Sequence, residues 1–115
     1  MAGVIWREVF TDSAYNTAVA ASGSETVKST ASNRHLYAPF NRLLVHNRDA
    51  IAIKMYLDGL DIAGNIFQLA AGEILIIEPE DGITFTTLKI ENLDSATAET
   101  ADTILYRWAK AVKVV

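Results

Sequence analysis

The chain lacks cysteine altogether, which excludes a disulfide framework, a thiolate metal site and a cysteine nucleophile. Histidine is scarce: His35 and His46 lie eleven positions apart with no acidic residue at the helical spacing of a zinc site, so ordinary turn positions fit them better. No apolar stretch approaches the roughly 18 residues of a membrane span. The first ten residues, MAGVIWREVF, lack the basic start and cleavage site of a secretory signal. We therefore expect neither membrane insertion nor Sec export.

Charge of either sign is also limited and dispersed. Fourteen acidic and ten basic residues give the 115-residue chain a formal net charge of −4. This distribution offers no basic surface for a phosphate backbone, so nucleic-acid binding is not expected. Half of the residues are hydrophobic, which suffices for the core of one domain without metal or disulfides.

No arrangement of residues in the sequence specifies catalysis. The serines lie in polar stretches without the strand-to-helix glycine elbow that exposes a hydrolase nucleophile. Acidic residues in two loop regions could bind calcium or act as an acid and base pair; they are Asp58, Asp61, Glu78, Glu80 and Asp81. Their spacing matches no calcium loop, and ordinary solvated loop residues explain them more simply. We expect no enzyme, no cofactor and no bound metal.

The sequence does contain short apolar runs between Arg42 and Leu93, with side chains alternating at period two and turn residues between the runs. This pattern is typical of an antiparallel β-sandwich or barrel, and we predict an all-β fold. The clearest strand spans residues 50–58, with one apolar face formed by Ile51, Ile53, Met55 and Leu57.

The connections between these strands can also be predicted. Residues 43–45 form a strand that ends at the polar turn 46–49, which favours a hairpin with residues 50–58. The continuous apolar run at 74–77 is typical of a central strand covered on both faces, and Pro79 ends it.

The last two strands are less regular. In residues 83–93 the apolar face changes parity at Thr86 and Thr87, which indicates a β-bulge. Residues 95–110 are rich in helix formers at helical spacing, yet their aromatic and β-branched content favours a strand at 103–112.

The N-terminal third differs from the rest in composition. Residues 4–10 predict a strand that is apolar on both faces, whereas residues 11–33 are mostly Ala, Ser, Thr and Asn and offer little surface to a core. Two loosely packed edge strands and an arm ordered by a neighbouring subunit both fit this composition. We therefore divide the chain into an N-terminal strand and arm, 1–34, packed on or swapped with a sandwich core, 35–115.

Apolar residues near the N terminus are candidate contact residues, because a small domain has little interior left to cover them. Most other aromatic side chains fit a sandwich core better than a sugar-binding face. The expected subunit contacts are Val4, Ile5, Trp6, Val9 and Phe10, with weaker candidates in Arg34, Tyr37 and Arg42 near the start of the core.

Five short strings between residues 41 and 92 resemble small virion proteins of tailed bacteriophages. They are NRLLVHNRD at 41–49, YLDG at 56–59, AGE at 71–73, GITF at 82–85 and IEN at 90–92. The resemblance implies a jelly-roll-like sandwich with an extended N-terminal arm, acting as a capsid cement or decoration protein. It implies that the partners are a second or third copy of this chain and the major capsid protein. The implied location is the capsid exterior, after assembly in the host cytoplasm.

The alternative function is recognition, either by a phage tail or fibre domain or by a carbohydrate-binding sandwich. Such a domain would use the loops at 58–65 and 78–82, and it would need an exposed aromatic platform beside them.

Overall fold

The computed structural model describes residues 5–15, 19–27, 37–58, 64–100 and 102–114. Within these ranges the chain forms strands and a short 3-10 turn but no α-helix. The strands are β1 (Ile5–Tyr15), β2 (Ser24–Val27), β3 (Arg42–Asn47), β4 (Ile53–Leu57), β5 (Ile66–Leu69), β6 (Ile74–Ile77), β7 (Leu88–Asn92) and β8 (Ile104–Val114), and the turn η2 (Pro79–Asp81) follows β6.

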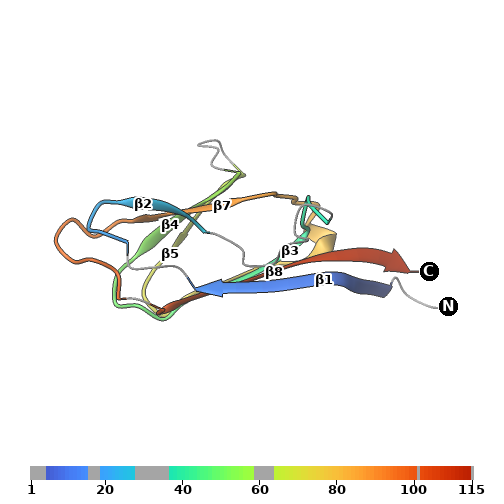
Figure 1. Cartoon of the computed structure of the whole chain (residues 1–115), viewed down its shortest axis with the longest axis horizontal. Helices are drawn as coiled ribbons and strands as arrows, with labels where there is room; N and C mark the ends of the chain where they lie inside the picture. Colours follow the sequence, from blue (N-terminus) through green and yellow to red (C-terminus); the bar gives the residue numbers. More distant parts are fainter. Residues whose placement is uncertain (1–4, 16–18, 28–36, 59–63, 101, 115) are drawn as a thin grey trace.

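The strands pack as two four-stranded antiparallel sheets (Figure 1). Sheet A has the order β1-β8-β3-β6 and sheet B the order β2-β7-β4-β5, so consecutive strands lie in opposite sheets except for β4 and β5. An eight-stranded double sheet with this order is a jelly roll. The predicted all-β, jelly-roll-like sandwich is therefore confirmed.

The core fills the space between the sheets and follows the period-two pattern of the strands. The four apolar side chains of the 50–58 face are buried, as predicted, although β4 itself begins only at Ile53. In β3 the inward residues Leu43 and Val45 are fully buried, whereas Leu44 between them faces outward and is half-buried. This alternation sets which side chains of sheet A remain available on its outer face.

An Asn-x-Asp sequence ends one strand in each sheet. Asn47 closes β3 and Asn92 closes β7, and each asparagine Oδ1 accepts the N–H of the aspartate two residues later. Both asparagines are buried, and their amide nitrogens donate to carbonyl groups of neighbouring loops. They pair the peptide groups that would otherwise stay unsatisfied where the chain leaves a sheet.

The predicted hairpin between residues 43–45 and 50–58 is wrong, because β3 and β4 lie in opposite sheets. After Asn47 the chain crosses from sheet A to sheet B, and the carboxylate of Asp49 holds this crossing in place. A polar turn between two apolar runs occurs in hairpins and in crossings alike, so the local pattern could not separate them.

The predicted bulge at Thr86 and Thr87 is also wrong. Phe85 pairs with Phe40 just before β3, whereas β7 begins three residues later in sheet B, so the apolar face changes because the chain changes sheets. Asp58 Oδ1 accepts the N–H groups of both threonines, at 2.6 and 2.9 Å, which satisfies the backbone across this second crossing.

The run at 74–77 forms an edge strand rather than the predicted central one, since β6 pairs only with β3. Ile77 is buried, but Ile74 and Ile76 are 54% and 56% exposed on the outer face of sheet A. An apolar run indicates two covered faces, and within the described chain only the inner face of β6 is covered. Pro79 ends the strand as predicted, at the first position of η2.

The first and last strands form a ribbon that projects beyond the rest of the sandwich at one end (Figure 1). β8 pairs with β1 from Val114 against Ile5 onwards, whereas β3 pairs only with residues 104–109 of β8. The C-terminal segment is therefore a strand, as favoured over a helix. In the described part of residues 11–33, the chain continues β1 and then adds β2 at the edge of sheet B, so two edge strands are present there.

Candidate interaction surface

The outer face of sheet A gathers charged and apolar side chains from three adjacent strands. Paired residues of neighbouring strands point to the same face, so the register places β8, β3 and β6 in rows. The outer-face grid has three rows. Leu44 lies between Arg107 and Ile76, and His46 between Leu105 and Ile74. In the third row Arg42 pairs with Ala109 and forms an ion pair with Glu78, just after β6.

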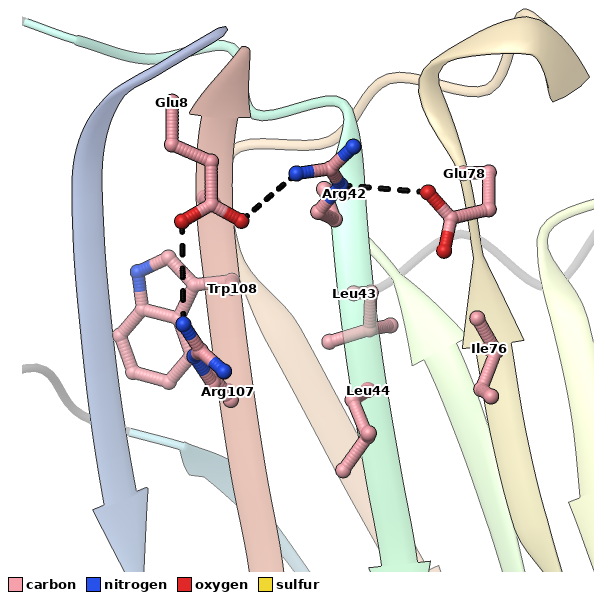
Figure 2. A pocket seen from close by; sticks show the side chains of 9 residues that line it. Glu8, Arg42, Leu43, Leu44, Ile76, Glu78, Arg107 and Trp108 are labelled. Atoms are coloured by element: carbon pink, nitrogen blue, oxygen red, sulfur yellow. Dashed lines mark hydrogen bonds and ion pairs between the residues drawn. The ribbon is translucent and has the colours of Figure 1, made fainter. Parts of the chain in front are cut away.

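The guanidinium of Arg42 links the outer strands of this face (Figure 2). Its Nη1 lies 2.8 Å from Glu8 Oε1 on β1, and its Nε lies 3.2 Å from Glu78 Oε2 just after β6. Arg107 on β8 approaches the other oxygen of Glu8 at 3.7 Å. These two cations and two anions balance, so the surface has no net charge of its own.

The charge network is anchored at Glu8. Hydrogen bonds from Thr11 Oγ1 and from Arg42 hold the pKa of the Glu8 carboxyl below its ordinary value of 4.5, so it is ionised at neutral pH. Because exposed ion pairs contribute only about 0–1 kcal/mol, the network orients side chains more than it stabilises the fold.

A groove of about 230 Å³ is lined by the four ion-paired residues and by neighbouring apolar side chains. Leu44 and Ala109 lie among its lining residues, and Ile76 stands at one side (Figure 2). Small-molecule sites usually enclose about 300–1,000 Å³, so this groove is better matched to the protruding side chains of another protein.

The sequence predicted part of this surface and missed the rest. Arg42 was a candidate, but Glu8 and Arg107 were not, because their proximity arises from strands far apart in the sequence. The exposed Ile74 and Ile76 were mistaken for core residues. The sequence feature that could have identified an edge strand is the short run of four apolar residues with a glutamate on each side. Short strands with flanking charges are typical of sheet edges.

The predicted N-terminal contacts lie on the β1–β8 ribbon. Ile5 is 58% exposed, Val9 is also exposed at a register shift in β1, and Val114 opposite Ile5 is exposed as well. Trp6 is half-buried. Val4 lies outside the described residues.

The other predicted contacts behave differently. The Phe10 ring stacks on Tyr37 with centroids 4.8 Å apart, and it also packs against Phe40, so both candidates cover the end of the core. Arg42 belongs to the ion network described above. Arg34 lies outside the described residues.

The aromatic side chains expected for a recognition platform are largely covered. Tyr56 is buried, with its hydroxyl donating to Glu91 at 2.8 Å and the ammonium groups of Lys54 and Lys89 near its ring. Phe67 is half-buried and packs against the core. Neither ring presents a flat exposed face beside the loops.

The acidic loop residues have structural partners. Asp58 binds the backbone at the second crossing, Glu78 pairs with Arg42, and Asp81 accepts the N–H of Glu78. In the parts of the chain that the structure describes, no group of three His, Cys, Asp or Glu side chains is placed to hold a metal ion. Asp61 and His35 lie outside those parts.

Two further findings concern the chain as a whole. No helix among the described residues has the length and apolar character needed to cross a membrane. No family model, no curated protein and no solved structure matches this chain, so the functional argument depends on its own surfaces.

Proposed function

We propose that this protein is a structural virion subunit: a capsid cement or decoration protein that stabilises a bacteriophage head by binding major capsid subunits and copies of itself. The resemblance in residues 41–92 suggests this class, and jelly rolls are common among capsid proteins. Because the same fold also serves unrelated functions, the proposal must rest on a surface feature.

The supporting observation is the β1–β8 ribbon that extends beyond β3 with apolar side chains on its exposed surface. A two-stranded ribbon is only marginally stable by itself in water, and exposed Ile5, Val9 and Val114 add to that cost. Contact with a larger shell would cover these side chains and pair the free strand edge. The proposed role therefore requires binding and no chemical step, at the capsid exterior after cytoplasmic assembly.

The test is co-sedimentation of the full chain with heads assembled from the major capsid protein of the same virus. The wild-type protein is expected to bind and to make the heads more resistant to heating. Ile5→Lys should weaken binding by at least about tenfold, because it places a charge in the proposed contact. Leu93→Lys is the matched control, since Leu93 is 41% exposed at the far end of the sandwich.

Absence of wild-type binding at micromolar concentrations would contradict the proposal. Equal binding by wild type and Ile5→Lys would instead show that the ribbon is not the contact with the head.

A further inference from the structure

We infer that the outer-face grid of sheet A is the docking site for a second copy of this chain, which produces a two-fold symmetric dimer. The inference rests on the proposed assembly role, and it adds the partner and the surface. The surface is separate from the protruding end of the ribbon.

The first reason is the exposure of apolar side chains on this grid. Ile74 and Ile76 project outward from β6, with half-buried Leu44 and Leu105 in the same rows. The fold does not require isoleucine at these positions, because β6 is already held by its inner residue Ile77 and by its pairing with β3. Leu44, Ile74 and Ile76 form a small apolar patch beside His46 and the charged residues, and an exposed apolar patch with a polar rim is typical of a protein–protein contact.

The second reason is that the charges at the two sides of the grid are incompletely paired within one chain. The Arg107 side chain is 56% exposed, and its ion pair with Glu8 is long, at 3.7 Å. The Glu78 side chain is 49% exposed and meets Arg42 at 3.2 Å. One side of the grid therefore presents a cation and the other an anion, each with capacity for a further partner.

These two features make the grid complementary to itself. A two-fold axis that lies parallel to β3 and passes over Leu44 places the β8 column of one copy over the β6 column of the other. Ile74 then faces Leu105 of the second copy, and Arg107 of that copy lies over Ile76. Successive rows are only about 7 Å apart, so the same guanidinium reaches Glu78 in the next row.

The charge pattern also selects the occupant. A nucleic acid needs an excess of cations, whereas the grid region holds two arginines and two glutamates. An isologous contact needs matching apolar positions and opposite charges on the two sides of its axis, and the β8 and β6 columns provide both. Arg42 and His46 lie under the axis and face their own copies, and the charge of Arg42 is balanced within its chain by Glu8 and Glu78.

The experiment measures the mass of the full-length protein by sedimentation equilibrium across a concentration series. The wild type is expected to be a dimer, and Ile76→Lys should raise the dimer dissociation constant by at least about tenfold. Leu93→Lys, an equally drastic change at an exposed leucine outside the grid, should leave the dimer unchanged. Circular dichroism of each variant checks that the sandwich is intact.

A charge exchange tests the register. Arg107→Glu and Glu78→Arg should each weaken the dimer, because each brings like charges together across the axis. The double variant restores opposite charges across the axis and should dimerise more tightly than either single variant, although it does not restore the ion pairs with Glu8 and Arg42 within each chain.

The possible results test the docking surface separately from the proposed capsid role. If the dimer dissociation constant is the same for the wild type, Ile76→Lys and both charge reversals, the grid is not the docking site. The chain would then associate with itself through another surface. If the wild-type protein is a monomer, the proposed dimer does not exist. Co-sedimentation tests head binding by the ribbon independently of this result.

Discussion

Asp49 illustrates how single polar residues hold the crossings of this jelly roll. Its carboxylate accepts the N–H groups of Ala50 and Ile51 on one side and, on the other, the N–H of Thr100 and the hydroxyl of Thr103. It therefore joins the loop after β3 to the loop before β8, which are fifty residues apart in the sequence. Removal of such an acceptor leaves donors unpaired that are partly or, for Ile51, fully buried.

The pKa of Asp49 connects this role to pH. Burial by itself raises the pKa, but the hydrogen bonds from Thr103 and from three peptide N–H groups outweigh burial and hold the pKa below its ordinary value of 3.8. When the pKa of a carboxyl is lower in the folded state than in the unfolded state, its ionised form stabilises the fold. This stability is fully present above the unfolded-state pKa. This stability is lost as the pH falls through the lower pKa of the folded state.

Asp49→Asn should therefore lower the free energy of unfolding at pH 7 by about 1–3 kcal/mol, because the amide nitrogen cannot accept from Thr100 and Thr103. The difference from wild type should shrink as the pH falls below about 4. Urea denaturation at a series of pH values measures both effects, with Asp102→Asn, at an exposed aspartate in the loop before β8, as control. Parallel stability curves for wild type and Asp49→Asn would contradict this role of the carboxylate.

The side chain of Asn41 extends the hydrogen bonding of β8 past the end of β3. Its side-chain nitrogen donates to the carbonyl of Ala111, and its oxygen accepts the Ala111 N–H, both at 2.8 Å. The side chain thus imitates one more residue of β3 at the base of the ribbon.

Asn41→Ala should raise the hydrogen-exchange rate of the Ala111 amide by about five- to tenfold, since it loses the partner of that N–H. Amides of β4 in sheet B should keep their wild-type rates. Unchanged exchange at Ala111 would show that β1 alone holds this part of β8.

The elements were predicted unevenly, for physical reasons. The buried face of residues 50–58 was predicted correctly because the opposite face is less covered and the sequence therefore alternates, although β4 itself spans only Ile53–Leu57. Residues 74–77 were misplaced because an apolar side chain on an edge strand has the same local sequence as one in a central strand. The two crossings were read as a hairpin and a bulge, since neither a polar turn with unchanged parity nor a change of parity reveals which sheet the chain enters.

At the scale of the whole molecule, the first and last strands meet. β1 pairs with β8 along its length, so sheet A is complete only when the first and last strands have come together. Aromatic packing of Phe40 with Phe85 and Trp108 joins both sheets at the end of the core. The two sheets therefore share one core and have no separable halves.

The protein should consequently unfold in one cooperative transition and refold slowly, in about milliseconds to seconds, as expected for topologies dominated by nonlocal pairing. The Trp6→Phe variant leaves Trp108 as the only tryptophan, whose emission can be excited selectively at wavelengths that tyrosine does not absorb. Its fluorescence midpoint in urea should coincide with the midpoint of the circular dichroism signal. Separate midpoints would mean that the sheets unfold independently.

The sequence by itself determined the fold class, because period-two alternation and the spacing of turns are local properties that burial of one strand face imposes. It also determined the absence of cysteine chemistry, since that depends on composition alone. Only the tertiary structure decided the strand order, the edge position of β6 and the grouping of Glu8, Arg42, Glu78 and Arg107. These depend on which distant strands pair, and neither the residues of a strand nor its turns encode the identity of its neighbour.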